Sequence, residues 1–405
     1  MVPDHPMHSQ ASSILEVFRK LSQNSDYLSQ PPAETNGRHR HLTAPEAIAG
    51  ALLEAGIWSE AGRMGPARWG HRATLLINGK VLITGFYSKI AKIYDPAPSE
   101  FRLVGAMVHQ HGVYSTATRL NDGRVLIVGG SDAPSSVEIF DPESEQFAEV
   151  CNLRFPRSAH SATLMADGRV LVAGGEVGPR NAGSAYAEVF DPKTAWFKTV
   201  GAMVERRKSH GAVLLLDGRV LLVGGGPIRP DGKPGDLRTA ELFHPVSGGF
   251  EATGRMNSPH ENLWCTEPHV LDDGRVLIVG GASARCGELY DPLSGRFSQT
   301  GRLLTSRSAA TAAKLPDGRV LVCGGYSISE NGVAATMDTS EFYDPVSNDF
   351  SPAASMREGR QQHTMTILPG GRVLVTGGWD SAAARDLASA EELWCAPAEV
   401  GELVN

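Results

Sequence analysis

The chain repeats one pattern of polar and apolar positions, which consists of an Asp-Gly pair, an arginine, four apolar residues and two glycines. The clearest copy is DGRVLIVGG at Asp122–Gly130; close copies begin at Asp167, Asp217, Asp273 and Asp317, and looser copies at Asn78 and Gly370. Seven copies at spacings of about 44 to 56 residues are typical of a propeller of small antiparallel sheets. We therefore predict an all-β, seven-bladed β-propeller.

Each copy is predicted to be a hairpin of two strands. The Asp-Gly pair favours a type I′ turn, in which both central residues take positive φ angles. Apolar runs such as Val170–Ala173 do not alternate with polar residues. Both faces of these strands must therefore be covered, as they are when each blade lies between two neighbours.

A third strand follows each glycine pair, and an aromatic residue five positions after its closing proline begins a fourth. The last copy ends at Ala390–Pro397 without a fourth strand, whereas Trp58–Met64 carries that pattern. We predict that residues 57–64 supply the outer strand of the seventh blade and close the ring of a propeller domain at 57–405. Residues 1–56 form a short N-terminal helical extension, since two capping boxes predict helices over about 14–28 and from Thr43 to Gly56.

The double glycine, the third-strand glutamate and the aromatic residue that follows resemble the kelch family of β-propellers, as in the central domain of galactose oxidase. The resemblance covers about residues 57–397. It implies the fold, and it leaves activity open because kelch propellers include both enzymes and interaction scaffolds. The copper-radical site of galactose oxidase needs a tyrosine adjacent to a histidine, and this sequence has no such pair.

Composition narrows the expected partners. A net charge of −7 without a basic stripe argues against nucleic acid, and no apolar run is long enough to span a membrane. No glycine-rich phosphate loop precedes a helix, so no nucleotide cofactor is expected. Five cysteines without CxxC spacing, and an N-terminus unlike a secretion signal, favour a cytoplasmic location.

One face of the propeller is predicted to carry the function. We name the strands of a blade A to D from the centre outward. The A–B and C–D turns are uniform in length, whereas the B–C connections vary, for example between Gly130–Glu138 and Gly225–Glu241. Variable loops on a rigid scaffold usually hold binding sites, so we place the site on the face of the B–C and D–A connections.

An R-x-x-H motif precedes strand A in four blades. Its histidines, His71, His160, His210 and His363, should lie near the channel mouth. They are candidate ligands of a divalent metal, and the alternative is that the motif belongs to the packing of the repeat. The arginines Arg157, Arg207 and Arg360 are candidate substrate-binding residues, whereas turn arginines such as Arg124 should pair with the third-strand glutamates.

Blades two and five depart most from the repeat. Their D–A connections gather the candidate acid–base residues His109, His111, Tyr114, His260, Glu261, Glu267 and His269. Trp264, Tyr326 and Trp379 are candidate substrate-binding aromatics. The alternative is that these connections are irregular loops with solvated polar residues.

These residues predict an enzyme that acts on a small organic molecule by non-redox acid–base chemistry, such as cyclisation, isomerisation or elimination. The second hypothesis is a scaffold that binds a peptide or protein through the long loops at Glu176–Ala185, Gly226–Arg238 and Tyr326–Thr339. The N-terminal helices are candidates for a homo-oligomer contact.

Overall fold

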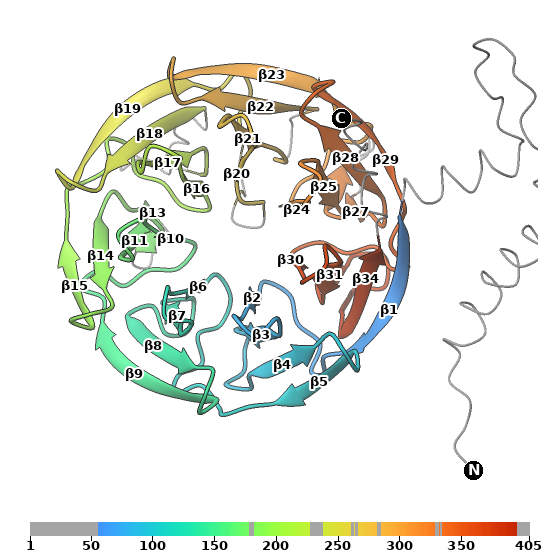
Figure 1. Cartoon of the computed structure of the whole chain (residues 1–405), viewed down its shortest axis with the longest axis horizontal. Helices are drawn as coiled ribbons and strands as arrows, with labels where there is room; N and C mark the ends of the chain where they lie inside the picture. Colours follow the sequence, from blue (N-terminus) through green and yellow to red (C-terminus); the bar gives the residue numbers. More distant parts are fainter. Residues whose placement is uncertain are drawn as a thin grey trace, which may run out of the picture. The chain divides into compact units, whose positions relative to one another are not determined.

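The computed structural model describes residues 56–177, 182–226, 238–260, 263, 266–281, 285–328, 332 and 334–394. These residues form seven four-stranded antiparallel sheets, arranged as blades around a central opening (Figure 1). The predicted all-β, seven-bladed propeller is confirmed. The helices predicted before Gly56 lie outside the described residues.

The strands of each blade follow one another from the centre outward. Blade one is β2 (Arg72–Leu75), β3 (Val81–Thr84), β4 (Lys92–Asp95), β5 (Glu100–Leu103); blade two is β6 (Thr116–Arg119), β7 (Val125–Val128), β8 (Ser136–Asp141), β9 (Gln146–Asn152); blade three is β10 (Ser161–Leu164), β11 (Val170–Ala173), β14 (Ala187–Asp191), β15 (Trp196–Thr199); blade four is β16 (Gly211–Leu214), β17 (Val220–Val223), β18 (Thr239–His244), β19 (Gly249–Arg255).

The remaining blades keep this order. Blade five is β20 (His269–Val270), β21 (Val276–Ile278), β22 (Cys286–Asp291), β23 (Arg296–Arg302); blade six is β24 (Thr311–Lys314), β25 (Val320–Cys323), β28 (Ser340–Asp344), β29 (Asp349–Ala353); blade seven is β30 (Thr364–Ile367), β31 (Val373–Thr376), β34 (Ser389–Trp394) and β1 (Ile57–Arg63). Small hairpins in the B–C connections of blades three, six and seven are β12 (Glu176–Val177) with β13 (Ala182–Gly183), β26 (Tyr326–Ile328) with β27 (Ala334–Thr336), and β32 (Trp379–Asp380) with β33 (Arg385–Asp386).

The first strand of the propeller closes its last blade. β1 runs antiparallel to β34, with Trp58 opposite Leu393 and Ser59 opposite Glu392. Figure 1 shows this blue strand beside the red strands of blade seven. The pairing gives the blade four strands from both ends of the domain, so the outer edge of β34 is covered.

The A–B hairpins have a three-residue loop, so the predicted type I′ turn is wrong. In blade two, the Gly123 N–H donates to the Leu120 carbonyl, and the Leu120 N–H donates to the Arg124 carbonyl. Gly123 has a φ of 91°, whereas Asp122 is not left-handed. This is a type I turn followed by a left-handed glycine, and the Asp122 carboxylate accepts the Arg124 N–H at 3.1 Å.

The core of the propeller lies between the blades. The B strands are buried on both faces, as at Val125–Val128. Each of seven apolar clusters joins two adjacent blades; one, for example, packs Leu126 and Val128 of blade two against Val170 and Val172 of blade three. The absence of alternation in these runs therefore reflects burial by a neighbour on either side.

Because consecutive strands are antiparallel, all B–C and D–A connections lie on one face, which we call the loop face. The innermost A strands line the central opening and begin at this face. Among the described residues, no helix is long and apolar enough to cross a bilayer.

Candidate functional site

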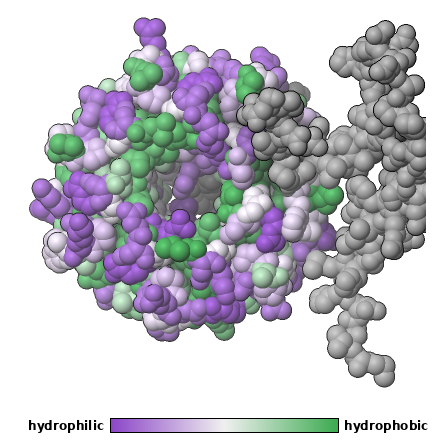
Figure 2. Space-filling model, viewed as in Figure 1, coloured by the Kyte–Doolittle hydropathy of each residue, from purple (hydrophilic) through white to green (hydrophobic). Residues whose placement is uncertain are grey.

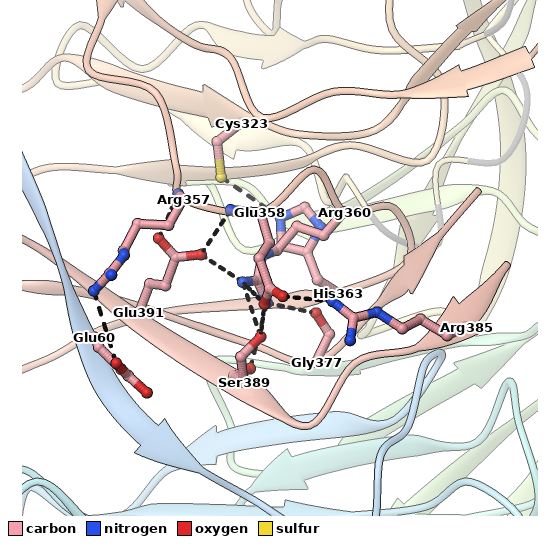
Figure 3. Close-up of polar contacts among 10 residues, drawn as sticks. All are labelled: Glu60, Cys323, Arg357, Glu358, Arg360, His363, Gly377, Arg385, Ser389 and Glu391. Atoms are coloured by element: carbon pink, nitrogen blue, oxygen red, sulfur yellow. Dashed lines mark hydrogen bonds and ion pairs between the residues drawn. The ribbon is translucent and has the colours of Figure 1, made fainter. Parts of the chain in front are cut away.

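A buried ion pair connects the D–A connection of a blade to its third strand. In blade seven, Arg360 Nη2 donates to Glu391 Oε1 at 2.6 Å, and Nη1 donates to the Gly377 carbonyl at 2.8 Å (Figure 3). Glu391 also accepts the backbone N–H of Arg357 at 2.7 Å. The Arg360 side chain is fully buried, so this arrangement fixes the loop face of the blade from within.

The same contacts occupy the other arginines of the motif. Arg157 Nη2 is 2.9 Å from Glu188 Oε2, and Arg207 Nη2 is 2.7 Å from Glu241 Oε1. The predicted substrate-binding role of Arg157, Arg207 and Arg360 does not fit, because their charges are paired inside the protein. Five turn arginines pair instead with the turn aspartates, as Arg124 does with Asp122 at 2.7 Å, so the predicted partnership with the third-strand glutamates is wrong for them. In blade seven, Arg372 does pair with a third-strand glutamate, Glu392, at 2.7 Å.

Two candidate catalytic histidines replace this arginine in the irregular blades. His111 shares a hydrogen bond with Glu138 Oε1 at 3.0 Å and with the Gly129 carbonyl at 2.6 Å. The His260 ring contacts the Gly280 carbonyl at 2.5 Å, and burial lowers its pKa to about 4. Both side chains are fully buried, so their geometry is that of the structural arginine rather than of an acid–base group.

The four motif histidines bind hydroxyl groups of the preceding blade. His160 Nε2 is 3.0 Å from Thr116 Oγ1, and His210 Nε2 is 2.8 Å from Ser161 Oγ. The same hydrogen bond joins His363 to Thr311 at 2.6 Å, and His71 to Thr364 at 3.2 Å and Thr376 at 2.8 Å. In each case one hydroxyl partner is the first residue of the preceding strand A, so the pair connects two blades; His71 also contacts Thr376 at the end of the preceding strand B.

In the four blades that precede a motif histidine, the first glycine of the pair makes room for this ring. Gly174 has a φ of 67°, and a Cβ placed on it would lie 2.7 Å from His210 Cε1 of the next blade. Gly324 stands in the same relation to His363, at 2.6 Å. The glycine and the histidine are therefore two halves of one contact between blades.

This packing does not suit a metal site. Burial lowers the pKa of His210 to about 3 and the pKa of the other three histidines well below the usual value, so the rings are neutral. Their Nε2 atoms bind hydroxyls at four separate junctions. In the part of the chain that the structure describes, no three His, Cys, Asp or Glu side chains gather closely enough to hold a metal ion.

Three junctions between blades lack the histidine–hydroxyl pair. The histidine position is Ser115 in blade two, Thr266 in blade five and Ala310 in blade six. In the preceding blade, the position of the hydroxyl partner is then Arg72, Gly211 or Glu267, respectively. Wherever the histidine is missing, its partner is missing as well, and two of these positions carry a charge instead.

Arg72 and Glu267 face the central channel. Two cavities of about 240 and 480 Å³ lie along the A strands, and Arg72, Ala117 and Glu267 line both of them. Arg72 Nε donates to the Ser115 carbonyl at 2.6 Å, which fixes its stem. Glu267 is exposed and makes no hydrogen bond or ion pair with another described residue. Figure 2 shows the opening with both hydrophilic and hydrophobic residues at its rim.

His269 lies two residues after Glu267 and lines the larger cavity. It hydrogen-bonds the backbone of Ala312, and its Nε2 atom is buried without a partner. Burial lowers the pKa of His269 to about 4, helped by the nearby charge of Lys314. Lys314 lines the same cavity and forms an ion pair with Asp272 at 2.5 Å. The imidazole is therefore neutral near pH 7.

The four motif histidines also line these cavities, His160 and His210 the smaller one and His71 and His363 the larger one, whereas the remaining predicted site residues that the structure describes do not. His109 is partly exposed and lies 3.6 Å from Glu149, whereas Tyr114 has a φ of 63° and its carbonyl accepts the Ala159 N–H. Tyr326 and Trp379 begin the hairpins β26 and β32. Glu261 and Trp264 lie outside the described residues. Among the predicted catalytic residues that the structure describes, Glu267 and His269 line the channel cavities and the others do not.

Sequence reasoning missed Arg72, although a signal for it exists. The residue after the motif histidine is Ser, Thr or Gly in five blades, Arg in blade one and Glu in blade five. A comparison of the blades at this register alone would have selected both charged residues. The regular R-x-x-H motif of blade one hid Arg72, since it made that blade look ordinary.

The fold defines this chain as a seven-bladed β-propeller, and the charged side chains of Arg72 and Glu267 line its central channel; we call these two residues the charged layer. A model of the kelch motif matches residues 112–154, which span blade two. A search of curated proteins finds no match. Among solved structures, the chain is similar to one described as a "novel fungal alcohol oxidase with catalytic diversity among the AA5 family, in complex with copper". The TM-score is 0.69 and the identity 16%, over 85% of this chain and 77% of that chain.

At this identity the likeness concerns the fold. The copper of that protein has no counterpart donor set among the described residues, where no cluster of three metal-binding side chains is found. We therefore derive no step through copper.

Proposed function

We propose that this chain is a cytoplasmic kelch-propeller enzyme that performs non-redox acid–base chemistry on a small organic molecule in the central channel. The observation that carries the proposal is the charged layer, in which Arg72 and Glu267 replace the hydroxyl residues of the repeat and line both cavities. A cyclisation, an isomerisation or an elimination is the expected class of reaction.

The roles follow from charge and position. The Arg72 guanidinium is permanently positive and suits a carboxylate or another anionic group of the substrate. Glu267 lines the same cavities and has no hydrogen-bond or ion-pair partner among the described residues, so its carboxylate can accept a proton from the bound molecule. The neutral His269 ring lies in the same cavity with a free Nε2 atom, and it can bind a substrate hydroxyl or receive a proton as the reaction proceeds.

The test uses solvent deuterium. The protein is incubated in D₂O with a defined set of small carboxylic acids, hydroxy acids and amino acids, and proton NMR records which carbon-bound hydrogens exchange. Acid–base catalysis predicts exchange or conversion of at least one compound by the wild type. Glu267→Gln should abolish it, because the amide cannot take up the proton at neutral pH.

The matched control is Glu143→Gln, which makes the same change in an exposed C–D turn on the opposite face. It should leave exchange unchanged. Exchange that survives in Glu267→Gln, or a wild type that neither exchanges nor converts any compound, would remove the support for the enzyme.

A second function, a protein-binding scaffold, is favoured by one observation on the loop face. Phe155 and Tyr186 stack with ring centroids 4.1 Å apart and an interplanar angle of 5°, and the Arg154 guanidinium lies 5.6 Å from the Phe155 centroid. Tyr186 is 46% exposed. Exposed tyrosines and arginines are typical anchors of protein interfaces.

The two functions separate by mutation. Under the scaffold hypothesis, Tyr186→Ala should weaken capture of a peptide from a random display library by about tenfold or more, whereas Glu267→Gln should leave capture intact. Under the enzyme hypothesis, Tyr186→Ala should leave the exchange reaction intact.

A further inference from the structure

Blade one lacks a carboxylate that each of the other blades has. In those blades a glutamate on strand C lies opposite the third residue of strand B; the pairs are Ile127 with Glu138, Val172 with Glu188, Leu222 with Glu241, Ile278 with Glu288, Val322 with Glu341 and Val375 with Glu391. At the same register in blade one, Ile83 lies opposite Lys92. A cation therefore occupies the place of the repeat's anion.

The buried arginine of blade one keeps its position although its partner is gone. Arg68 is fully buried, like Arg157, Arg207, Arg307 and Arg360, whose guanidinium groups are 2.6 to 2.9 Å from a glutamate. Arg68 Nη1 reaches only the carbonyls of Gly85 and Ile90, each at 3.4 Å. Its Nη2 atom is buried and has no hydrogen-bond partner among the described residues.

Electrostatics makes this arrangement unfavourable without an anion. Burial lowers the pKa of Arg68 to about 10, and burial together with the Arg68 charge lowers the pKa of Lys92. A buried charge without a counter-ion is costly, and every other described guanidinium of this set is neutralised by a carboxylate. Two adjacent cations create a site that an external anion would stabilise.

The D–A connection of blade one has space for such an anion. In blades three, four, six and seven, the repeat glutamate accepts the N–H of the residue after the buried Met or Leu, for example Arg154 N at 3.0 Å from Glu188. Gly65 holds this position in blade one. Apart from Gly65 itself and its neighbours Met64 and Pro66, no atom lies within 4 Å of the point where a Gly65 Cβ would be, and Lys92 is partly exposed, so the position is open toward the surface.

We propose that Arg68, Lys92 and the backbone at Gly65 bind a small monovalent anion, a halide or a carboxylate of formate size, in place of the missing repeat glutamate. The anion lies beside Arg68 Nη2, takes the position of the carboxylate and completes the blade. This site is separate from the channel, so it does not depend on the proposed catalytic function.

The test is the thermal unfolding of the full chain at constant ionic strength. Sodium gluconate, whose anion is too large for the site, is replaced stepwise by sodium bromide or by sodium formate. The Tm of the wild type should rise in a saturable manner with one or both small anions. A rise with bromide alone identifies a halide site, whereas a rise with formate alone identifies a carboxylate site.

Lys92→Glu restores the carboxylate of the repeat, so its Tm in gluconate should exceed that of the wild type, and its response to bromide and formate should disappear. Lys89→Glu makes the same charge change at an exposed residue of the same blade and should keep the wild-type response. A wild type that is insensitive to both anions, or a response that Lys92→Glu retains, would overturn the proposal. Anomalous diffraction of bromide-soaked wild-type crystals gives a reading that needs no variant: a peak beside Arg68 is expected, and its absence would contradict the site.

Discussion

The junction between blades three and four and the junction between blades five and six use the same register in opposite ways. At the first, His210 of blade four binds Ser161 of blade three at 2.8 Å. At the second, the histidine position is Ala310 and the hydroxyl position is Glu267. The sheets on both sides are equivalent, but a hydrogen bond joins the two blades at the first junction. At the second junction, a carboxylate without a partner among the described residues faces the channel.

The comparison distinguishes polar groups that pair with each other inside the protein from polar groups that can still contact a ligand. Polar groups that recur in most blades are buried and paired with each other, as in the pairs of His160 with Thr116 and of Arg157 with Glu188. A polar group that appears once has no partner provided by the repeat. Glu267 is of this second kind. Arg68 belongs to the repeat, but the glutamate that pairs with this arginine elsewhere is replaced by Lys92 in blade one, and Arg72 replaces a hydroxyl residue of the repeat and lines both cavities. These three residues carry the two proposals.

The largest effect should come from breaking a buried ion pair. Glu341→Ala leaves Arg307 buried without its carboxylate at 2.6 Å, so the free energy of unfolding should fall by about 3–5 kcal/mol. Urea unfolding followed by circular dichroism measures it. Asp122→Ala, which breaks the exposed pair with Arg124, should cost no more than about 1 kcal/mol. Equal costs for the two variants would contradict a structural role for the buried pairs.

Removal of one histidine–hydroxyl pair should have an intermediate effect. His160→Ala leaves the buried Thr116 hydroxyl unsatisfied and should lower the free energy of unfolding by about 2 kcal/mol. The same measurement on Ser115→Ala provides the comparison, because Ser115 Oγ is buried at the equivalent position without a partner. That variant should be neutral or slightly stabilised; a loss as large as that of His160→Ala would count against the pairing.

Acid should destabilise the junctions that contain a histidine–hydroxyl pair. His210 has a folded pKa of about 3 against an ordinary value of 6.5, so between these values the unfolded chain binds more protons than the folded chain. Its contribution is therefore complete above pH 6.5 and falls by about 1.4 kcal/mol per pH unit as the pH decreases toward 3. His210→Gln should reduce the slope of the unfolding free energy against pH. A slope that matches the wild type in this variant would contradict burial of a neutral imidazole.

The smallest effect should come from building the pair where it is absent. Ala310→His combined with Glu267→Thr introduces a histidine and a hydroxyl residue at the junction of blades five and six, as in the junctions that already contain this pair. A Cβ on Gly280 would be 3.8 Å from the Arg307 carbonyl, so there is more space here than at Gly174, where the equivalent distance is 2.6 Å. The double variant should gain about 1 kcal/mol in thermal or urea unfolding. A clear destabilisation would show that this junction is shaped against the pair.

Much of the fold could be predicted because the same sequence pattern occurs seven times along the chain. The Asp-Gly turns, the doubly buried B strands and the outer-strand pattern at Trp58–Met64 are local features with fixed physical meaning. The type I′ turn was wrong because the loop has three residues, and loop length depends on the strand register that only the pairing of Arg119 with Val125 reveals.

Two residues of the candidate site could be selected from the sequence, and their catalytic role stays a prediction. Glu267 and His269 were found because blade five departs from the repeat, whereas His111 and His260 were misjudged for the same reason. Insertions in these blades shift the numbering, so two histidines that replace a buried arginine looked like new polar groups. Whether a polar residue is satisfied inside the protein depends on contacts with the strand C glutamate, about 30 residues away in sequence.

The sequence by itself determined the seven blades, the uniform turns and the set of irregular positions, because these follow from local patterns and from the period of the repeat. Only the tertiary structure decided which polar groups remain available. The partners of His160, Arg157 and Arg68 come from another strand or another blade, and hydrogen bonding and desolvation depend on distances in space. A histidine in a motif is therefore a ligand, a base or a packing residue according to what lies across the junction.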